Sequence, residues 1–299
     1  MAFYNKLSDH LQRRFGCKVY KLALEGGMTC PNRDGTLDTR GCIFCGADGS
    51  GAFAQTGETV FAQIEAAKQR VASKIKNGRY IAYFQSFTNT YAPVSYLDAL
   101  FRSAISHPDV AVLSIATRPD CLPEPVLDLL AELNQIKPVW VELGLQTIHE
   151  ETARYIRRGY ALPVYEQAVK ALHARGLEVI THVILCLPGE TREQMLETVR
   201  YVGQHTDGIK LQLLHVLRDT DLETDYAAGR FRLPEPEEYC HLVADCLRVL
   251  PQNVVIHRLT GDGAKKDLIA PLWTGDKKRV LNTMNRVLDE EQVVQGSHV

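Results

Sequence analysis

The 299-residue sequence lacks any run of about 18 consecutive apolar residues, the length that a membrane-spanning helix needs. Its first residues, MAFYNKLSDHLQRRFG, lack the apolar core of a signal peptide. Low-complexity segments and short internal repeats are also missing. A formal net charge of −2 gives no overall basic bias towards nucleic acid, although local basic clusters exist. These absences predict an ordinary globular protein of the cytoplasm with no membrane partner.

Cysteine, by contrast, is plentiful: there are eight, and without an export signal they are expected to be reduced thiols. Cys30, Cys42 and Cys45 fall in one stretch, from Gly26 to Gly51, that is rich in glycine and other turn formers. Eleven residues separate the first two cysteines and two separate the last pair. A loop this long inside a compact domain is usually functional, and three converging thiolates would give it a shape.

The number of cysteines in this loop is informative. A structural zinc ion normally takes four protein ligands, and each metal corner of an iron–sulfur cube also needs a ligand. Three cysteines therefore leave one corner of a cube open for a small molecule. The alternative is a zinc site that borrows a remote histidine or cysteine, although none of the other cysteines has C-x-x-C spacing: Cys17, Cys121, Cys186, Cys240 and Cys246. The residues alone leave open a cluster enzyme and a non-catalytic, zinc-stabilised RNA-binding module.

Strand and helix patterns alternate about six times between residues 19 and 216. Short connections between such units predict a parallel sheet with right-handed crossovers. The first strand-to-helix turn is cysteine-rich and has no G-x-G-x-x-G, which argues against a dinucleotide-binding fold. The predicted helices cover residues 2–15, 59–76, 95–106, 123–135, 163–175 and 191–204, and strands include 19–24, 110–117, 138–146, 177–187 and 208–216.

Polar residues on these strands favour a partial barrel over an open, doubly covered sheet. Period-two alternation places Tyr83 with Gln85, and Glu142 with Gln146, on shared faces. Both faces of a doubly covered parallel sheet would be apolar. A polar lumen suits a barrel that encloses a polar cofactor at the carboxyl ends of its strands, where Gln85, Arg118 and Gln146 fall.

The pattern changes after residue 217, where a charged, turn-rich segment precedes a helix at about 235–249 and the strand NVVIHRL. We therefore expect an α/β protein in which residues 1–217 form a partial (β/α)6 TIM-like barrel with an N-terminal helix and the cysteine loop. Residues 218–299 are expected to form a C-terminal α/β extension that packs on the open side of the barrel.

With these segments assembled, the chain resembles radical S-adenosylmethionine (SAM) enzymes, and within them the YhcC-type group related to the elongator catalytic subunit. The ending Cys42-Ile43-Phe44-Cys45 matches the C-x-aromatic-C ending of that superfamily, and the stretched first spacing matches the elongator relatives. The segments that carry the resemblance are CPNRDGTLDTRGCIFC, AYFQSFTNTY, TRPDCLP, VWVELGLQT, THVILCLPGET, GIKLQLLHV and APLW.

The resemblance implies the cofactors and the reaction. Cys30, Cys42 and Cys45 would bind three irons of a [4Fe–4S] cluster, and SAM would chelate the fourth. An external electron donor of the flavodoxin or ferredoxin type would reduce the cluster. The electron would cleave SAM to methionine and a 5′-deoxyadenosyl radical, which abstracts hydrogen from the substrate.

The resemblance, with the strand-end argument, also gives expected SAM contacts: Phe44, Gln85, Ser86, Arg118, Gln146, Arg158, His182 and Gly189. Phe44 would lie beside the adenine. Gln85 and Ser86 would take the methionine amino end, in place of the GGE-type element of the superfamily. Gln146 and Arg158 match residues that related enzymes use on the SAM ribose and carboxylate, and an arginine fork suits a carboxylate.

Four positions near the fifth and sixth strands complete the set of candidates. His182 stands where some relatives carry aspartate, and Gly189 would let the backbone approach the adenine closely. Cys186, expected beside the lumen, and His215, at the end of the sixth strand, are the catalytic candidates. Either could meet the substrate, the cysteine as a donor of a hydrogen atom.

The substrate itself is not implied by the motifs. The elongator relationship suggests an RNA, such as a tRNA base, and two basic clusters permit it: Arg154, Arg157 and Arg158 in the first, and Lys277, Lys278 and Arg279 in the second. A small metabolite or a peptide is equally compatible with the sequence.

Overall fold

The computed structural model describes residues 3–47, 49, 54–75, 77–261, 263 and 265–299. Parts of the predicted N-terminal helix, of the cysteine loop and of the helix over 59–76 lie outside the described residues. The positions concerned are 2, 48, 50, 51 and 76.

The elements follow the predicted alternation, with ends that differ by a few residues. The helices are α1 Leu7–Phe15, α2 Val60–Val71, α3 Val94–Ser106, α4 Glu124–Asn134, α5 Glu150–Tyr155, α6 Leu162–His173, α7 Arg192–Gly203, α8 Asp221–Ala227, α9 Pro236–Arg248 and α10 Lys277–Glu290, with 3-10 turns η1 Pro119–Cys121 and η2 Leu272–Gly275. The strands are β1 Val19–Glu25, β2 Arg79–Gln85, β3 Val110–Thr117, β4 Val139–Gln146, β5 Glu178–Leu185, β6 Gly208–Leu213, β7 Val216–Leu217, β8 Val255–Arg258 and β9 Leu268–Ala270. No described helix is long and apolar enough to cross a membrane.

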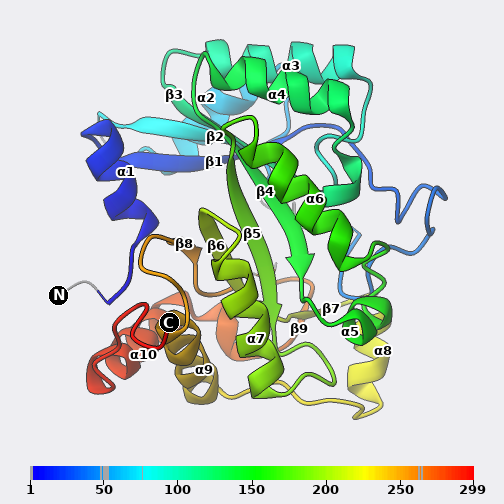
Figure 1. The fold of residues 1–299 in the computed structure, drawn as a ribbon, viewed down its shortest axis with the longest axis vertical. Coiled ribbons are helices and arrows are strands. Elements are labelled where there is room, and N and C mark those ends of the chain that lie inside the picture. The colour runs from blue at the N-terminus through cyan, green and yellow to red at the C-terminus, as the bar shows by residue number, and fades with distance from the viewer. Residues whose placement is uncertain (1–2, 48, 50–53, 76, 262, 264) are drawn as a thin grey trace.

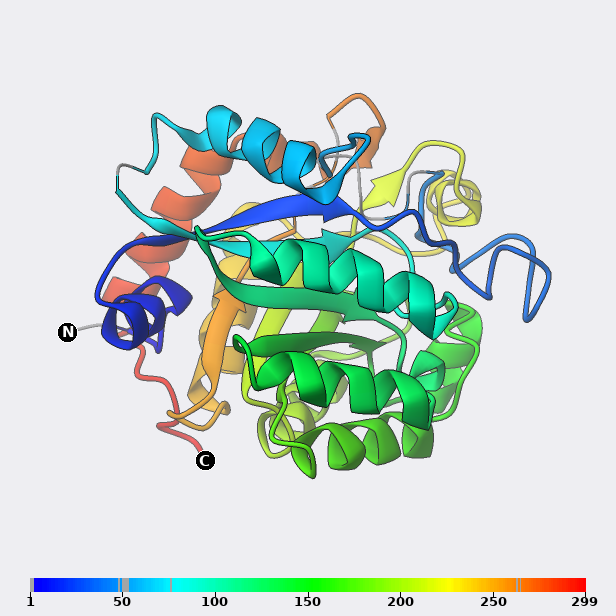
Figure 2. The same ribbon diagram turned by 90° about the horizontal axis from the view of Figure 1, so that it is seen from above.

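Seven strands form one curved sheet in the order β1-β2-β3-β4-β5-β6-β8, and every neighbouring pair is parallel. Helices α2, α3, α4, α6 and α7 cover its convex face (Figures 1 and 2). The sheet is a half-barrel, which confirms the predicted fold class. The structure adds a seventh strand, β8, from the segment expected to form the extension, because β8 pairs with β6. The division of the chain at residue 217 stays a prediction.

The N-terminal helix is shorter than the predicted span because the residues before it pair with the sheet. Lys6 forms a parallel bridge with Ile256 of β8, and the carbonyl of Asn5 accepts a hydrogen bond from the Ile256 amide at 2.9 Å. The helix ends at Gly16, whose φ of 67° is the left-handed conformation typical of a glycine cap. The two ends of the chain meet here, since the amide of Gln295 donates to the carbonyl of Phe3 at 3.1 Å.

Apolar core residues lie on both faces of the sheet. The larger layer lies between the strands and the covering helices. A smaller layer lies inside the barrel, where Leu11 of α1 packs with Tyr83, Trp140 and Ile180 from the strands. Helix α1 thus packs against the lumen side of the sheet, and ligands are left to enter at the carboxyl ends of the strands.

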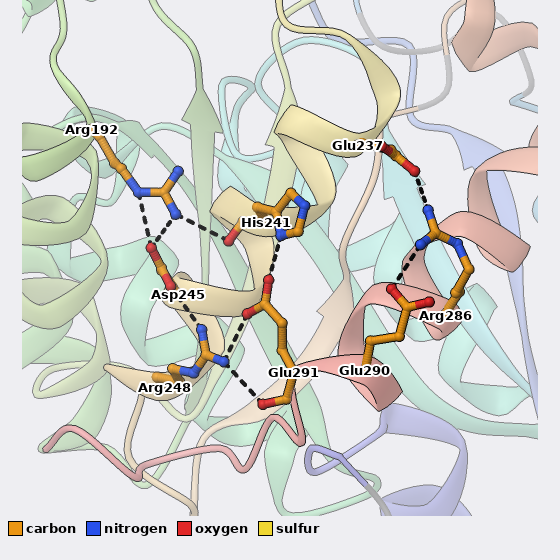
Figure 3. Close-up of polar contacts among 8 residues, drawn as sticks. All are labelled: Arg192, Glu237, His241, Asp245, Arg248, Arg286, Glu290 and Glu291. Atoms are coloured by element: carbon orange, nitrogen blue, oxygen red, sulfur yellow. Dashed lines mark hydrogen bonds and ion pairs between the residues drawn. The ribbon is translucent and has the colours of Figure 1, made fainter.

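Ion pairs on the outer surface attach the C-terminal helices to the barrel (Figure 3). Arg192 of α7 donates to Asp245 of α9, with Nε and Oδ2 2.9 Å apart. Arg248 contacts Asp245 and also Glu291, whose Oε2 lies 2.7 Å from its Nη2, and His241 contacts the same Glu291 carboxylate. A second group joins Arg286 to Glu237 and Glu290. These pairs connect α7, α9 and the end of α10.

Replacing Glu291 with glutamine is expected to lower the free energy of unfolding at pH 7 by up to about 1 kcal/mol. Burial raises the pKa of this carboxyl, but hydrogen bonds from His241 and Arg248 outweigh it, so the pKa lies below its usual value. A lowered pKa gives stability that is lost as the pH falls through it. Urea unfolding from pH 7 to 3 should therefore show the two proteins converging at acid pH. Glu58→Gln, at an exposed site, is the control, and a constant difference would contradict the prediction.

Candidate active site

The cysteine loop leaves the carboxyl end of β1 and is shaped by short backbone turns. Tyr96 of α3 donates its hydroxyl to the carbonyl of Gly26 at 2.9 Å, where the loop begins. The carbonyl of Cys30 accepts the amide of Arg33 at 2.8 Å, and the amide of Cys45 donates to the carbonyl of Cys42 at 2.9 Å. These turns direct the cysteine side chains from a segment whose described residues form no helix or strand.

The structure brings the three predicted cysteines together. Burial, then the charge of Cys45, raises the pKa of Cys42 to about 12, and Cys30 adds to the effect. Burial also raises the pKa of Cys45, which Cys30 influences in the same direction. Such thiols stay protonated unless a positive centre joins them, and a coordinating metal deprotonates a thiol outright. The donor set therefore fits a metal cluster.

Asn32 and Arg33, between the first two cysteines, hold the loop in place. The buried amide of Asn32 donates to the carbonyl of Arg157 at 2.8 Å and lies 3.5 Å from the sulfur of Cys42. Arg33 donates through Nη2 to the carbonyls of Cys45 and Gly46, both at 2.7 Å. From the sequence, Asn32 was only one of several turn formers. Its partner Arg157 is distant in the sequence, and the partners of Arg33 lie at the end of the cysteine motif, so neither set of contacts could be predicted.

The segment that follows β2 presents polar atoms that have no hydrogen-bond partner among the described residues. Ser86 and Phe87 follow β2 with φ angles of 79° and 56°, which turn the chain sharply. Asn89 donates through Nδ2 to the carbonyls of Ala116 and Ser86 at 3.0 and 2.9 Å. Its Oδ1, and Oγ1 of Thr88, are buried without a hydrogen-bond partner among the described residues. Strained backbone and orphaned acceptors together are typical of a ligand site.

Gln146, at the end of β4, shows the same combination of a positive φ angle and a buried oxygen acceptor. Its φ is 71°, and its buried Oε1 has no partner among the described residues. A side chain on Gly144 would come within 2.9 Å of the Gln146 amide, so glycine leaves room for it. Tyr160 donates its hydroxyl to the carbonyl of Gly144 and so fixes this strand end. Gln85, the residue that ends β2, pairs with Glu25 in the register of the sheet.

Arg118 and Arg158 lie at the site, but their donors are directed at the chain itself. Arg118 pairs with Asp120 at 2.7 Å and donates through Nη1 to the carbonyl of Arg158 at 2.9 Å. Arg158 donates to the carbonyls of Thr147 at 2.6 Å and Tyr160 at 2.8 Å, and pairs with Glu150 at 2.9 Å. In this arrangement both guanidinium groups hold loops together, and their contact with SAM stays a prediction.

The first basic cluster of the sequence does not form a basic surface. Arg158 is buried, and Arg157 pairs with Asp221 at 2.5 Å, which leaves Arg154 as the exposed member of that cluster. Lys277, Lys278 and Arg279 of the second cluster are exposed in the first turn of α10. The first cluster therefore gives little support to an RNA substrate, because tertiary contacts use two of its three charges.

Cys186 does not lie where alternation along β5 predicts. Its φ of 67° breaks the period of two. The residue packs against the core layer of the covering helices, and its amide lies 3.0 Å from the sulfur of Met195 on α7. Burial raises the pKa of its thiol to about 12. Its predicted position beside the lumen is therefore corrected, and this packing argues against the proposed hydrogen-atom donation.

The remaining predicted residues lie near the carboxyl end of the barrel. Phe44 packs, half-buried, with an apolar cluster that includes Ile184 and Leu187. Gly189 has a φ of 87°, which favours glycine, and a side chain there would meet nothing within 4 Å. His215 contacts the hydroxyl of Thr274 in η2 at 3.1 Å, so it meets the C-terminal segment. Their roles with SAM or substrate stay predictions.

A buried charged network, centred on Glu142 of β4, crosses the lumen below these strand ends. The carboxylate is fully buried and accepts Lys21 of β1, Ser114 of β3 and His182 of β5, each at 2.7 Å. Lys210 of β6 donates to the same carboxylate. Burial raises the pKa of Glu142, but the charges of Lys21 and Lys210 outweigh it and hold the pKa well below its usual value.

His182 enters this network as a neutral ring. Burial, then the charge of Lys210, lowers its pKa to about 4. A neutral imidazole that faces a carboxylate must donate, so Nε2 carries the hydrogen and the other ring nitrogen accepts. The predicted SAM contact of His182 stays a prediction, and the structure gives the ring a second role in holding Glu142.

Comparison with known proteins decides the family. The family model of the radical SAM superfamily matches residues 39–202, and that of the Radical_SAM C-terminal domain matches residues 206–290. The chain belongs to the radical SAM superfamily. Membership in this enzyme superfamily, with its [4Fe–4S] cluster and SAM, overturns the alternative of a non-catalytic zinc-stabilised module.

Within the radical SAM superfamily, the chain falls in the YhcC/YtqA group. It is 45% identical to YtqA of Bacillus subtilis (strain 168) over 98% of this chain and 92% of that protein. It is 38% identical to YhcC of Escherichia coli (strain K12) over 98% of this chain and 94% of that protein. A more distant match is Elongator complex protein 3 of Mus musculus, 27% identical over 58% of this chain and 31% of that protein.

Solved structures show the same radical SAM fold. The archaeal Elp3 of Methanocaldococcus infernus superposes with a TM-score of 0.71 at 16% identity, over 93% of this chain and 64% of that chain. Methylornithine synthase (PylB) superposes with a TM-score of 0.53 at 13% identity, over 95% and 85%. At these identities the likeness concerns the fold alone.

Proposed function

We propose that this radical SAM enzyme uses Cys30, Cys42 and Cys45 to hold a [4Fe–4S] cluster and cleaves SAM reductively at the carboxyl end of its half-barrel. The observation that carries the proposal is the grouping of three partly buried thiols, two of them with raised pKa values, beside strand ends whose acceptors are unpartnered among the described residues. When bound, the cluster and SAM would supply an electron and a 5′-deoxyadenosyl radical that abstracts hydrogen from the substrate.

The chain's own residues would bind and orient SAM. Oδ1 of Asn89 and Oε1 of Gln146 are acceptors suited to ammonium or hydroxyl donors of SAM, and both are unpartnered among the described residues. Arg118 and Arg158 would act as positioning residues that fix the strand ends and the loop around residue 158. Phe44 and Gly189 would border the adenine.

These contacts concern SAM and do not identify the class of substrate. An RNA substrate stays a prediction, and its support is limited to the exposed cluster Lys277, Lys278 and Arg279. If RNA is bound, purified protein should retain tRNA in a salt-sensitive manner. Superfamily membership implies an external reductant, and we expect a flavodoxin or a ferredoxin in this role.

The proposed function predicts that the anaerobically reconstituted and reduced protein converts SAM to methionine and 5′-deoxyadenosine. Both products would be quantified by liquid chromatography with mass spectrometry, and iron and zinc would be measured in the same sample. The control omits the reductant and should give neither product. Protein that retains zinc alone, or that binds iron but leaves SAM intact under reduction, would contradict the proposal.

A further inference from the structure

Strands β1 to β6 each place one polar side chain in a single hydrogen-bonded network on the lumen face. The contributors are Lys21, Tyr83, Ser114, Glu142, His182 and Lys210, and His257 of β8 lies near enough to feel the charges of Lys21 and Glu142. Neighbouring residues on the same strands, such as Leu22, Phe84 and Val141, face the covering helices instead. The cluster loop and the SAM contacts use little of this network: only His182 is among the expected SAM contacts.

The hydrogen-bond donors and acceptors of this network do not balance. Lys21 and Lys210 share the single carboxylate of Glu142. His182 is neutral near pH 7, because its pKa is lowered to about 4 by burial and by Lys210. The central contacts therefore contain two amino groups for one carboxylate, and burial, against the attraction of Glu142, holds the pKa of Lys210 well below its usual value. A site with more hydrogen-bond donors than acceptors favours an anion that can accept from them.

Two further polar atoms in the lumen have no hydrogen-bond partner among the described residues. Nε1 of Trp140 and Nδ1 of His257 are buried, and neither has a hydrogen bond to any described residue. Their rings are in edge contact, with centroids 5.2 Å apart. Trp140 lies two residues before Glu142 on the same face of β4, and it is 1% exposed. An indole N–H can only donate, so its missing partner must be an acceptor.

The network can be reached from outside the sheet. The side chains of Lys21 and His182 keep 22% and 16% of their area exposed, whereas Glu142 keeps none. His182 is paired with Gly144 in the sheet and therefore lies nearer the strand ends than Glu142. A small group that enters between the strand ends and the network would meet these two side chains first.

We propose that this network is the binding site for an anionic group of the substrate, a carboxylate or a phosphate, with Lys21 as its main contact. The proposal rests on the proposed function, because it places the substrate in the lumen beneath SAM. The anion would pair with the Lys21 ammonium group and accept hydrogen bonds that the described residues leave unmade. Ammonium–anion hydrogen bonds are among the strong ones in proteins.

Anion binding can be measured on the purified full-length protein without SAM cleavage. Inorganic phosphate and malonate serve as probes across the millimolar range, with sodium chloride at matched ionic strength as the reference. Thermal unfolding gives one readout. Fluorescence gives a second, because the chain has two tryptophans and Trp273→Phe leaves Trp140 as the reporter. We expect phosphate or malonate to raise the Tm and to change Trp140 emission, and which of them does so distinguishes the two anions.

Three variants make the test specific. Lys21→Met should weaken binding at least roughly tenfold, since it removes one charge-assisted hydrogen bond. The double variant Glu142→Gln/Lys210→Met removes the buried pair, frees Lys21 from its competing carboxylate and should bind roughly tenfold more tightly. Lys170→Met, on the exposed surface of α6, should bind like the parent protein.

Several outcomes would overturn the proposal. They are an unchanged Tm and emission with both probes, equal binding by the parent protein and Lys21→Met, or equal weakening in Lys170→Met. Failure of SAM cleavage would leave these readouts intact, because they require neither iron nor SAM. Conversely, if the protein cleaves SAM but neither anion changes its Tm or its Trp140 emission, the proposed function stands and the anion site is wrong.

Discussion

Cys45→Ala is expected to abolish iron binding and to reduce 5′-deoxyadenosine formation by at least ~100-fold, the upper end of the cost of outer-shell substitutions at metal sites. The reason is the count of ligands. Three thiols meet at the site, so an alanine leaves two, and a cube with two open corners is not retained. Iron and sulfide content, visible absorbance and product formation would be measured after anaerobic reconstitution.

A matched control separates ligand loss from general damage. Cys17 precedes β1, at the opposite end of that strand from the cysteine loop, and is also partly exposed. Cys17→Ala should keep the full iron content and full SAM cleavage. If Cys45→Ala retained iron, or if Cys17→Ala lost it equally, the assignment of the three ligands would be wrong.

The fold was predictable because its signals are local. Period-two alternation in β3 and β4 and the helix patterns between strands depend on neighbours within a few residues. The seventh strand was recognised as a strand, but its place was not. Val255–Arg258 joins the sheet beside β6 although α8 and α9 intervene in the chain. Such pairing depends on where the helices pack, which periodicity does not encode.

The candidate site was predictable to the extent that its residues form motifs. Cys42 and Cys45 lie in a spacing whose chemistry is specific, and Cys30 follows the first strand. The contacts of Arg158 were not predictable, since its partners are backbone carbonyls that converge only in the folded loop. The side on which Cys186 lies was also hidden, because one positive φ angle reverses an alternation that sequence reasoning assumes.

The charged network around Glu142 was only partly predictable from the sequence. Alternation alone placed Glu142 on the polar face of β4. Its direct contact with Lys21 and Lys210 requires the curvature of the sheet, which brings β1 and β6 towards the same carboxylate. A curved parallel sheet thus brings separate polar positions into one network of contacts.

Glu142→Gln is accordingly expected to lower the free energy of unfolding by about 3–5 kcal/mol, the cost of leaving one member of a buried ion pair without its partner. Lys210, 4% exposed and with a pKa that burial holds well below its usual value, would then have no carboxylate beside it. Urea unfolding at pH 7, followed by circular dichroism, measures the difference. Glu151→Gln, at an exposed position of α5, should change the free energy by less than about 1 kcal/mol.

The double variant Glu142→Gln/Lys210→Met decides whether the loss comes from the pair. An apolar side chain in place of the ammonium group removes the uncompensated charge, so the double variant should recover at least half of the stability lost in Glu142→Gln. The coupling free energy from the cycle of four proteins should then exceed about 1 kcal/mol, as residues in direct contact show. Additive losses would mean that Glu142 and Lys210 do not interact as an ion pair in the folded protein, and the charged network would have to be redrawn around Lys21 and His182.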